Sequence, residues 1–586
     1  MFQKATLLLV LAVLAPLSGL VWAGDTPVPA TTLIPDDAVL VVRVAEPKVL
    51  IERAFDKRIV DFVQALPPYK DVMARAETQQ VLTMVNFFQT KYQADVPTML
   101  GRLLGGGITL ALGPNDAALL IVDAEDEKMV AEIHDFFRTI AKGEATKQGS
   151  PDRVASADYR GITGWTFGPG ESHAMIGSRL LLANKPEALK AAIDRQLDQT
   201  GKDLAQSSRY QTAVGSVAGK PQVTLFADMG VLKQLPGFQQ GLAQNDNPMA
   251  RLLFAPFLAA MSEATWLAAG IDISQDGVAA NVVADCTPSQ PTELNSFALP
   301  LKAGEGAMPN LVVPGQIAAL SFYRDLHKFY AAKDDLFPGR TSGLIFFENM
   351  MGIFFSGMDL TEEVLAETLP DIRVVVAEQR FDEKTGTPAM KLPGFAVIVQ
   401  LRDPAKFEVV MNEAWQKAIG LVNFTRGQKA QPGLIIKSAT HNDTTYTTSF
   451  FSLAKEENKD AADMRFNFQP ALAIEGDRLI MSSSDALVRD LIDALRQERE
   501  QGVAPISGQH SLAMVKSGPL ASILESNREA LVRQSMVDDG KTREEAEQGV
   551  AALFLVLKYV TDLQIEAGTQ ADRSNMTVKI KYDLPH

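Results

Sequence analysis

The chain has 586 residues, of which 46% are hydrophobic and 22% are charged, so it can bury large cores in more than one domain. Its formal net charge of −15 repels nucleic-acid phosphates and anionic lipid heads, which argues against either as a general partner. Cys286 is the only cysteine, which excludes an internal disulfide framework and makes a redox role for its thiol the less favoured interpretation.

The N-terminal residues 1–23 are predicted to be a secretory signal peptide. Lys4 supplies the positive start, residues 6–20 are mostly apolar, and small residues precede Gly24, where we expect cleavage. The alternative is an uncleaved membrane anchor, which is disfavoured because the apolar run is shorter than the ~20 residues that a span needs. The protein is therefore expected in the periplasm or outside the cell.

The first part of the mature chain alternates between short apolar runs and longer runs with helical spacing. Short runs bounded by turn residues predict strands, and longer runs with apolar residues four apart predict helices. The strands are expected at residues 39–44, 108–112, 118–122, 159–167, 173–176, 179–183, 222–228, 266–273 and 278–284. The main helices are expected at about 47–66, 71–92, 126–142, 187–197 and 249–261.

One unit of sequence recurs late in the chain. Residues 177–197 and 476–495 both contain a turn, an apolar strand and an amphipathic helix. Leu189 in the first helix and Leu487 in the second begin an apolar face with a spacing of four residues. The strands and helices around both copies follow in a similar order, which predicts an internal duplication.

We therefore expect two duplicated halves, at 34–286 and 313–584, with a linker rich in Pro, Gly and Ser at 287–312. Most neighbouring strands are separated only by short turns. This favours an α+β fold in which each half is a largely antiparallel sheet with helices packed on one face. The alternative is an α/β arrangement with more parallel pairs.

The opening sequence Ile34-Pro35-Asp36-Asp37-Ala38, with the strand and Pro-started helix after it, resembles a family of secreted bacterial proteins known only as a domain of unknown function. Residues 476–481 and the helix after them share this resemblance, which implies an exported bacterial protein and assigns no catalytic residues. The second half has Gly315-Gln316 where the first has Asp36-Asp37, which argues against a functional role for the two aspartates.

The sequence contains no recognisable catalytic or metal-binding motif. The six histidines, at 134, 173, 327, 441, 510 and 586, are scattered and form no His-x-x-x-His pair. There is no Gly-x-Ser-x-Gly elbow and no phosphate-binding loop. His134 is expected to be a satisfied core or boundary residue. We therefore predict no catalytic, cofactor-binding or metal-binding residues and no cofactor.

Three polar or glycine-rich clusters have structural interpretations that we prefer. Residues 105–107 are three glycines that are expected to end a helix rather than hold a phosphate. The acidic cluster of Asp123, Glu125, Asp126 and Glu127 is expected to begin a helix rather than bind calcium. Residues 482–485 read Ser-Ser-Ser-Asp and are expected to cap a helix rather than to contain a nucleophile.

The run from Phe346 to Met358 is unusual because Phe and Met surround more than half of the expected helix. Phe346, Met350, Phe354 and Met358 are spaced four apart, with further Phe and Met residues beside them. We expect a central core helix. The alternative is one wall of a hydrophobic groove, because Met and Phe adapt to varied apolar ligands.

These observations favour a non-enzymatic exported envelope protein that binds or scaffolds a partner, such as another envelope protein. A carrier or sensor of an apolar ligand is the second hypothesis, and a hydrolase of unrecognised class is the third. A closed apolar cavity would support the carrier, whereas an exposed apolar patch without a cavity would support a protein-binding module.

Overall fold

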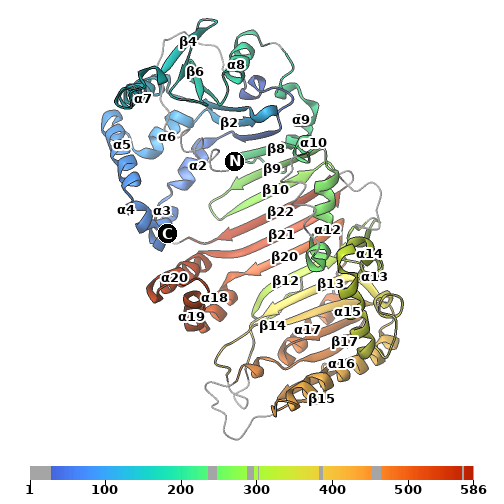
Figure 1. Ribbon diagram of the computed structural model, residues 1–586. Helices are drawn as coiled ribbons and strands as arrows, with labels where there is room; N and C mark the ends of the chain where they lie inside the picture. Colours follow the sequence, from blue (N-terminus) through green and yellow to red (C-terminus); the bar gives the residue numbers. More distant parts are fainter. Residues whose placement is uncertain are drawn as a thin grey trace. The chain divides into compact units, whose positions relative to one another are not determined.

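The computed structural model (Figure 1) describes residues 28–199, 201–234, 247–286, 296–300, 302–381, 387–451, 463–570 and 573–584. The signal peptide predicted at 1–23 lies outside these residues. The contacts divide the chain into two compact units. Unit 1 contains Met1–Phe238, Ala264–Asp285 and Leu584–His586, and unit 2 contains Gln239–Glu263 and Cys286–Asp583.

Unit 1 is built on an antiparallel sheet. Its strands are β1 (Leu40–Val44), β2 (Gly107–Leu112), β3 (Ala118–Asp123), β4 (Ala155–Tyr159), β5 (Ile162–Thr166), β6 (Ser172–Ile176), β7 (Arg179–Ala183), β8 (Val223–Asp228), β9 (Trp266–Ile273) and β10 (Gly277–Ala284). They pair in the order β4-β5-β6-β7-β3-β2-β1-β8-β9-β10, and every one of these pairings is antiparallel.

Helices cover both faces of this sheet, so the prediction that they pack on one face is wrong for unit 1. The helices are α2 (Pro47–Ala54), α3 (Lys57–Ala65), α4 (Pro67–Ala74), α5 (Ala76–Tyr92), α6 (Val96–Leu104), α7 (Glu127–Lys147), α8 (Pro186–Asp198), α9 (Ser208–Gly215) and α10 (Met229–Leu232). Leu181 packs with α8 on one face, whereas Leu180 and Leu182 pack with α7 on the other. The sequence carried this signal, because β7 lacks the polar alternation of a half-exposed strand and all its residues are buried.

Unit 2 is also built on antiparallel strands. Its strands are β12 (Gln316–Tyr323), β13 (Thr368–Ala377), β14 (Gly394–Leu401), β15 (Leu434–His441), β16 (Thr444–Phe451), β17 (Ala471–Glu475), β18 (Arg478–Ser482), β20 (Gln509–Lys516), β21 (Val560–Gln570) and β22 (Arg573–Tyr582). They pair in the order β15-β16-β17-β18-β14-β13-β12-β20-β21-β22. These pairings are also all antiparallel, and the predicted α+β class is confirmed.

The helices of unit 2 likewise lie on both faces of its sheet. They are α12 (Pro248–Glu263), α13 (Leu326–Ala331), α14 (Lys333–Leu336), α15 (Thr341–Phe354), α16 (Pro404–Gly427), α17 (Asp485–Glu500), α18 (Ser517–Ser526), α19 (Arg528–Asp538) and α20 (Arg543–Tyr559). Leu491 and Ile492 of α17 pack on Ile480, whereas Phe407 of α16 packs on Leu479. The π-helical turn η7 (Leu360–Val364) adds Val364 to the second of these cores.

The two units therefore run through their strands in the same order, each with a long helix after its third strand and another after its seventh. Leu189 and Leu487, which we expected to be equivalent, are both 4% exposed. An internal duplication predicts this correspondence, and the duplication itself stays a prediction. The boundaries at 34–286 and 313–584 also stay predictions, and α12 belongs to unit 2 although its sequence precedes the expected linker.

Across the described ranges, we find no helix with the length and apolar character required to traverse a lipid bilayer.

Candidate functional site

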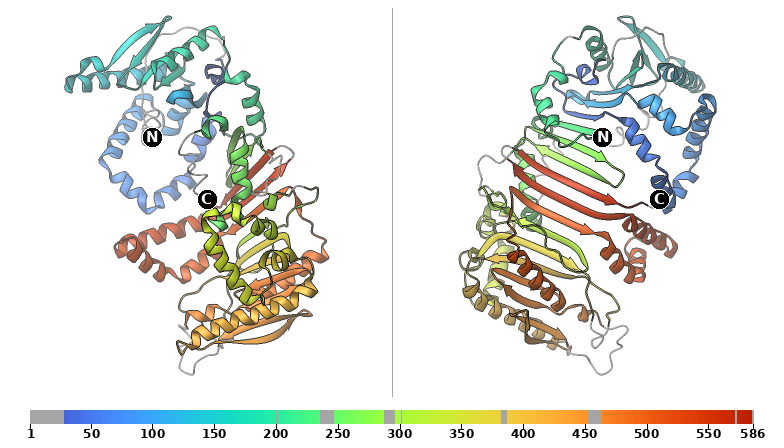
Figure 2. Two further views of the ribbon diagram at one scale, coloured as in Figure 1. Left: turned by 45° about the vertical axis from the view of Figure 1, so that its right-hand side comes forward. Right: turned by 180° about the vertical axis from the view of Figure 1, so that it is seen from behind.

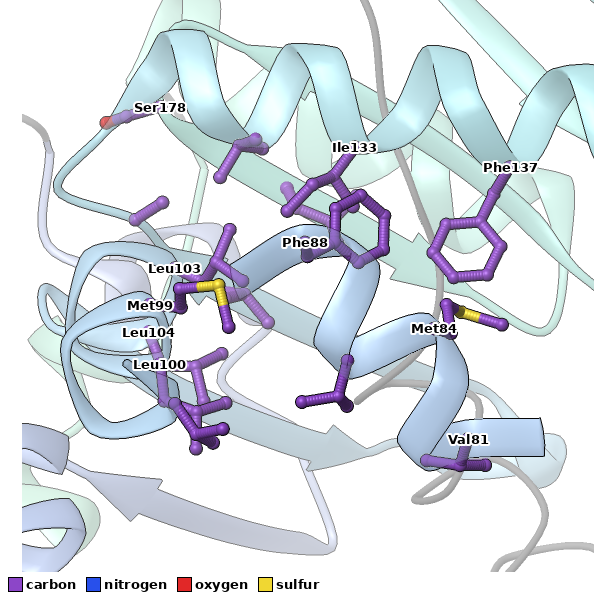
Figure 3. Close-up of a pocket in the computed structure, with 16 residues that line it drawn as sticks. Val81, Met84, Phe88, Met99, Leu100, Leu103, Leu104, Ile133, Phe137 and Ser178 are labelled. Carbon is purple, nitrogen blue, oxygen red and sulfur yellow. The ribbon is translucent and has the colours of Figure 1, made fainter. Parts of the chain in front are cut away.

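An apolar pocket of about 180 Å³ lies in unit 1 between α5, α6 and α7 and the strands β3 and β7 (Figure 3). Of the 16 residues that line it, Ser178 alone has a polar side chain. The walls consist of Val81, Met84, Val85 and Phe88 from α5; Val96, Met99, Leu100, Leu103 and Leu104 from α6; Val130, Ile133 and Phe137 from α7; and Val122, Ala124, Ser178 and Leu180 from the sheet and its turns.

Helix α6 is fixed at both ends by residues that the sequence made recognisable. The Asp95 side chain accepts a hydrogen bond from the backbone N–H of Thr98 at 2.9 Å and so caps the helix. The glycines at 105–107 end it, as predicted, and Gly106 has a further role. A Cβ at Gly106 would lie 2.7 Å from the carbonyl oxygen of Asp123, so only glycine lets this turn approach the end of β3.

The floor of the pocket is the junction between β3 and α7. Asp126 caps α7 by accepting from the backbone N–H of Met129 at 2.9 Å. Asp123 accepts a hydrogen bond from the Arg179 guanidinium at 2.6 Å, which ties the end of β3 to the start of β7. Ala124 lies between Asp123 and Asp126 in the chain, and its small side chain lines the pocket.

Helix α5 forms the roof and is anchored mainly at its C-terminal end. The Tyr92 hydroxyl donates to Glu132 at 3.2 Å, and Lys91 pairs with the same carboxylate at 3.0 Å. Lys91 lowers the pKa of Glu132. The Phe88 ring meets the Phe136 ring edge to face, with 5.0 Å between centroids. The N-terminal half of α5 carries Val81, which is exposed at its outer edge.

A buried pair of histidines joins α7 to the sheet, with His134 on α7 and His173 on β6. His134 Nε2 lies 3.2 Å from His173 Nε2, and Nδ1 of His173 bonds to Glu171. Burial, followed by the nearby His173 and Arg138 charges, lowers the pKa of His134 to about 2, so its ring is neutral. The rings of Trp165 and Phe167 pack against it. His134 is thus a satisfied core residue, as predicted, and the sequence did not indicate that it meets His173.

The acidic cluster at 123–127 begins a helix, as expected. Asp126 is the N-cap, Asp123 pairs with Arg179, and Glu125 pairs with Lys48 at 2.7 Å. Three of the four carboxylates therefore have structural partners within the protein. Among the described residues, no group of three or more His, Cys, Asp or Glu side chains is placed to hold a metal ion.

The serines at 482–484 hold the turn between β18 and α17. Ser484 is the N-cap residue, although its own side chain makes no capping bond. Ser483 Oγ accepts from the backbone N–H of Phe395 at 3.0 Å, and Ser482 Oγ accepts from the N–H of Ser484 at 3.1 Å. These two hydroxyls thus bond to the backbone of the turn and of β14. Cys286 is a free, buried thiol that donates to Glu263 at 3.5 Å.

Three further histidines, at 327, 441 and 510, lie in unit 2. His441 bonds to Asp493 at 2.8 Å, and His327 lies 3.5 Å from Glu362. His510 is buried, and burial together with the nearby charge of Arg324 lowers its pKa to about 3. His586 lies outside the described residues.

The Met/Phe helix, which is α15, is not the central core helix that we expected. Phe346 is 71% exposed and Ile353 is 68% exposed, and none of the described side chains of α15 is fully buried. Leu344 packs against one core of unit 2 near the start of the helix, and Phe355 and Met358, after its end, pack against Phe407 and its neighbours. Sequence periodicity could not distinguish these cases, because an apolar helix looks the same whether or not another element covers it.

A buried arginine in unit 2 was not anticipated from the sequence. Arg324 donates to the carbonyl oxygens of Leu252 (2.6 Å), Leu253 (2.8 Å) and His510 (2.8 Å). Leu252 has a free carbonyl because Pro256, one turn later in α12, has no N–H. Burial lowers the pKa of Arg324 to about 9. Its role is to hold a proline-interrupted helix, and no carboxylate is among these partners.

The corresponding place in unit 2 is filled by side chains. Leu401 follows the last register pair of β14 as Ala124 follows that of β3, and Asp403 caps α16 as Asp126 caps α7. Phe407 lies four residues after the cap Asp403, as Val130 lies four residues after the cap Asp126. Leu401 and Phe407 are buried in one cluster. These two buried side chains are larger than those of Ala124 and Val130, which line the pocket of unit 1.

Comparisons with known proteins add little about function. Residues 83–305 match the family model described as "Protein of unknown function (DUF3352)", which confirms the resemblance to an uncharacterised family. Crystal forms IV and III of TP0453 are similar at 11% identity, with TM-scores of 0.24 and 0.26. The similarity covers 46% of this chain and 83% and 84% of those chains, and at such TM-scores it carries no argument. No curated protein matches the chain.

Proposed function

We propose that the protein is a non-enzymatic binding protein that holds an apolar ligand, such as a hydrocarbon chain, in the pocket beneath α5. The observation that carries this proposal is a preformed cavity whose lining offers one polar side chain, Ser178. An engineered apolar cavity of about 150 Å³ is large enough to bind benzene. The pocket, at about 180 Å³, is of the same order.

The chemistry of the walls supports binding rather than catalysis. Met84 and Met99 are flexible and polarizable, so they adapt to ligands of different shape. General acid–base catalysis needs a titratable group within hydrogen-bonding reach of the substrate, and the pocket lining contains none. His134 and His173 are not among the residues that line the pocket.

We also propose that the protein works in the cell envelope after export. The support is the charged start, apolar run and small residues before Gly24. N-terminal sequencing of the protein from its native cell tests this. A mature chain that starts at Met1 contradicts it.

The binding proposal is tested by titrating the full chain with N-phenyl-1-naphthylamine, a neutral dye that fluoresces in apolar sites, and by displacing it with decanol. Val130→Phe places the side chain of the filled unit 2 site into the pocket. We expect it to weaken dye binding by about tenfold or more, which corresponds to about 1.4 kcal/mol.

The matched control is Phe346→Ser, which removes an exposed apolar side chain far from the pocket lining in sequence and in a different unit. It should leave decanol-displaceable binding unchanged. Equal dye binding in the parent protein and in Val130→Phe would exclude the pocket as the site.

A further inference from the structure

The helices α2 to α5, residues 47–92, form an arm of unit 1 that buries very little of itself. Of its described side chains, only Pro47 and Phe88 are fully buried. Phe55 is 41% exposed and Val63 is 40% exposed, and Val72 and Phe87 are exposed as well. A helix of a globular protein usually places its apolar stripe on a core, so this arm is unusual.

The arrangement of the arm explains its exposure. Its helices follow one another in an open arc (Figure 2), and α3 packs chiefly on its neighbours α2 and α4. Ile59, Val63 and Leu66 share one face at the spacing of an amphipathic helix. None of the described side chains of α3 is fully buried. The apolar face of α3 is therefore not covered by a core of unit 1.

The charge of the arm differs from that of the rest of the protein. Residues 47–92 contain seven Lys and Arg and five Asp and Glu, a net charge of +2. The whole chain carries −15, so the remainder carries −17. The Lys57 side chain is 87% exposed, and Arg75 is also exposed. The arm thus has both exposed apolar side chains and a net positive charge, whereas the remainder of the chain is negatively charged.

We infer that the arm binds the surface of a bilayer that contains anionic lipids. An amphipathic helix lies in such an interface with its apolar face in the acyl region and its basic residues among the head groups. An arm-to-arm contact between two copies of the chain is disfavoured, because both arms carry the same sign of charge. The acidic remainder of the chain does not oppose this binding as long as the arm alone touches the membrane.

The ligand class inferred for the arm rests on the proposed function of the pocket. Helix α5 belongs to the arm and also forms the roof of the pocket, where Val81 and Met84 line it. A membrane-bound arm therefore brings the pocket next to hydrocarbon chains. The predicted ligand class is accordingly a lipid acyl chain taken from that surface.

The test is flotation of the full-length mature chain with vesicles of phosphatidylcholine, with and without phosphatidylglycerol. We expect the parent protein to partition more strongly onto the anionic vesicles. Lys57→Gln and Arg75→Gln should each weaken this partition about fivefold, since one basic residue near an anionic surface contributes on the order of 1 kcal/mol. Phe55→Ser should weaken it by roughly tenfold or more.

The matched control is Phe346→Ser on α15, because the Phe346 side chain is 71% exposed whereas that of Phe55 is 41% exposed. If this variant loses vesicle binding and the arm variants keep it, the membrane-binding surface is α15 and the inference is wrong. Equal binding to neutral and anionic vesicles, or an arm-dependent dimer without vesicle binding, also overturns it.

The same variants separate this inference from the proposed function. Phe55, Lys57 and Arg75 do not line the pocket, so decanol-displaceable dye binding should persist in all of them. Retained dye binding without vesicle binding leaves the pocket function standing and removes the membrane docking. Vesicle binding without dye binding leaves the membrane docking standing and removes the pocket function.

Discussion

His134 on α7 and His173 on β6 meet at their Nε2 atoms, 3.2 Å apart, and both rings are 1% exposed. Nδ1 of His173 bonds in turn to Glu171. The pair therefore joins the helix that walls the pocket to the sheet beneath it. Protonation of His134 would place a positive charge in a buried site, close to His173 and Arg138.

The stability of the protein should therefore fall in acid. The pKa of His134 is about 2 in the folded state, against an ordinary value of 6.5. Between these values the unfolded chain binds a proton that the folded chain does not. The free energy of unfolding then decreases as the pH is lowered, by about 1.4 kcal/mol per pH unit. Urea unfolding at several pH values measures this slope.

The variant His134→Gln should flatten the slope below about pH 6, even if it lowers stability at neutral pH. The groups that face His134 are His173, Glu171 through His173, and Arg138, and none of them is changed in this variant. His441→Gln, which removes a partly exposed ring, is the control and should leave the slope as it is. An unaltered slope in His134→Gln would show that this ring does not control the acid response.

Much of the fold could be predicted from local sequence. The cap at Asp95, the capping box of Thr542 and Glu545, and the recurring strand and helix around Leu189 and Leu487 all depend on neighbouring residues, and the structure has them. The pocket could not be predicted in this way. It depends on how closely α5, α6 and α7 approach one another, and a helix that lines a cavity has the same periodicity as one that lines a core.

The buried Arg324 should be energetically coupled to Pro256. Arg324→Met leaves the Leu252 carbonyl without its donor, and an unpaired buried carbonyl costs about 1–3 kcal/mol. Pro256→Ala supplies an N–H one turn later in α12 that can bond to that carbonyl. We expect Arg324→Met to cost about 1 kcal/mol less in the Pro256→Ala background. Additive losses in the double-mutant cycle would refute the coupling.

The Met/Phe helix α15 should tolerate substitution on its exposed side. Phe346→Ser should change the free energy of unfolding by about 0.5 kcal/mol or less, because the side chain is 71% exposed. Leu491→Ala, in the core of unit 2, should cost about 2–5 kcal/mol. Denaturant unfolding followed by tryptophan fluorescence compares the two. A large loss in Phe346→Ser would indicate that a partner or a second copy covers α15 in solution.

The filled site of unit 2 provides the reciprocal test of the pocket. Phe407 packs with Leu401 where Val130 and Ala124 leave space in unit 1. Phe407→Val should therefore open a cavity, at a cost of about 1–3 kcal/mol, less than the ~3–5 kcal/mol of complete truncation to Ala. If cavity size alone decides binding, this variant should bind a second molecule of dye. The double variant Phe407→Val with Val130→Phe should keep one dye-binding site, now in unit 2.

Isothermal titration gives the stoichiometry of dye binding for each variant, and differential scanning calorimetry gives the cost in stability. A Phe407→Val protein that is destabilised yet still binds a single dye molecule would mean that the surroundings of the unit 1 pocket, and above all the roof helix α5, are needed for binding in addition to the open space.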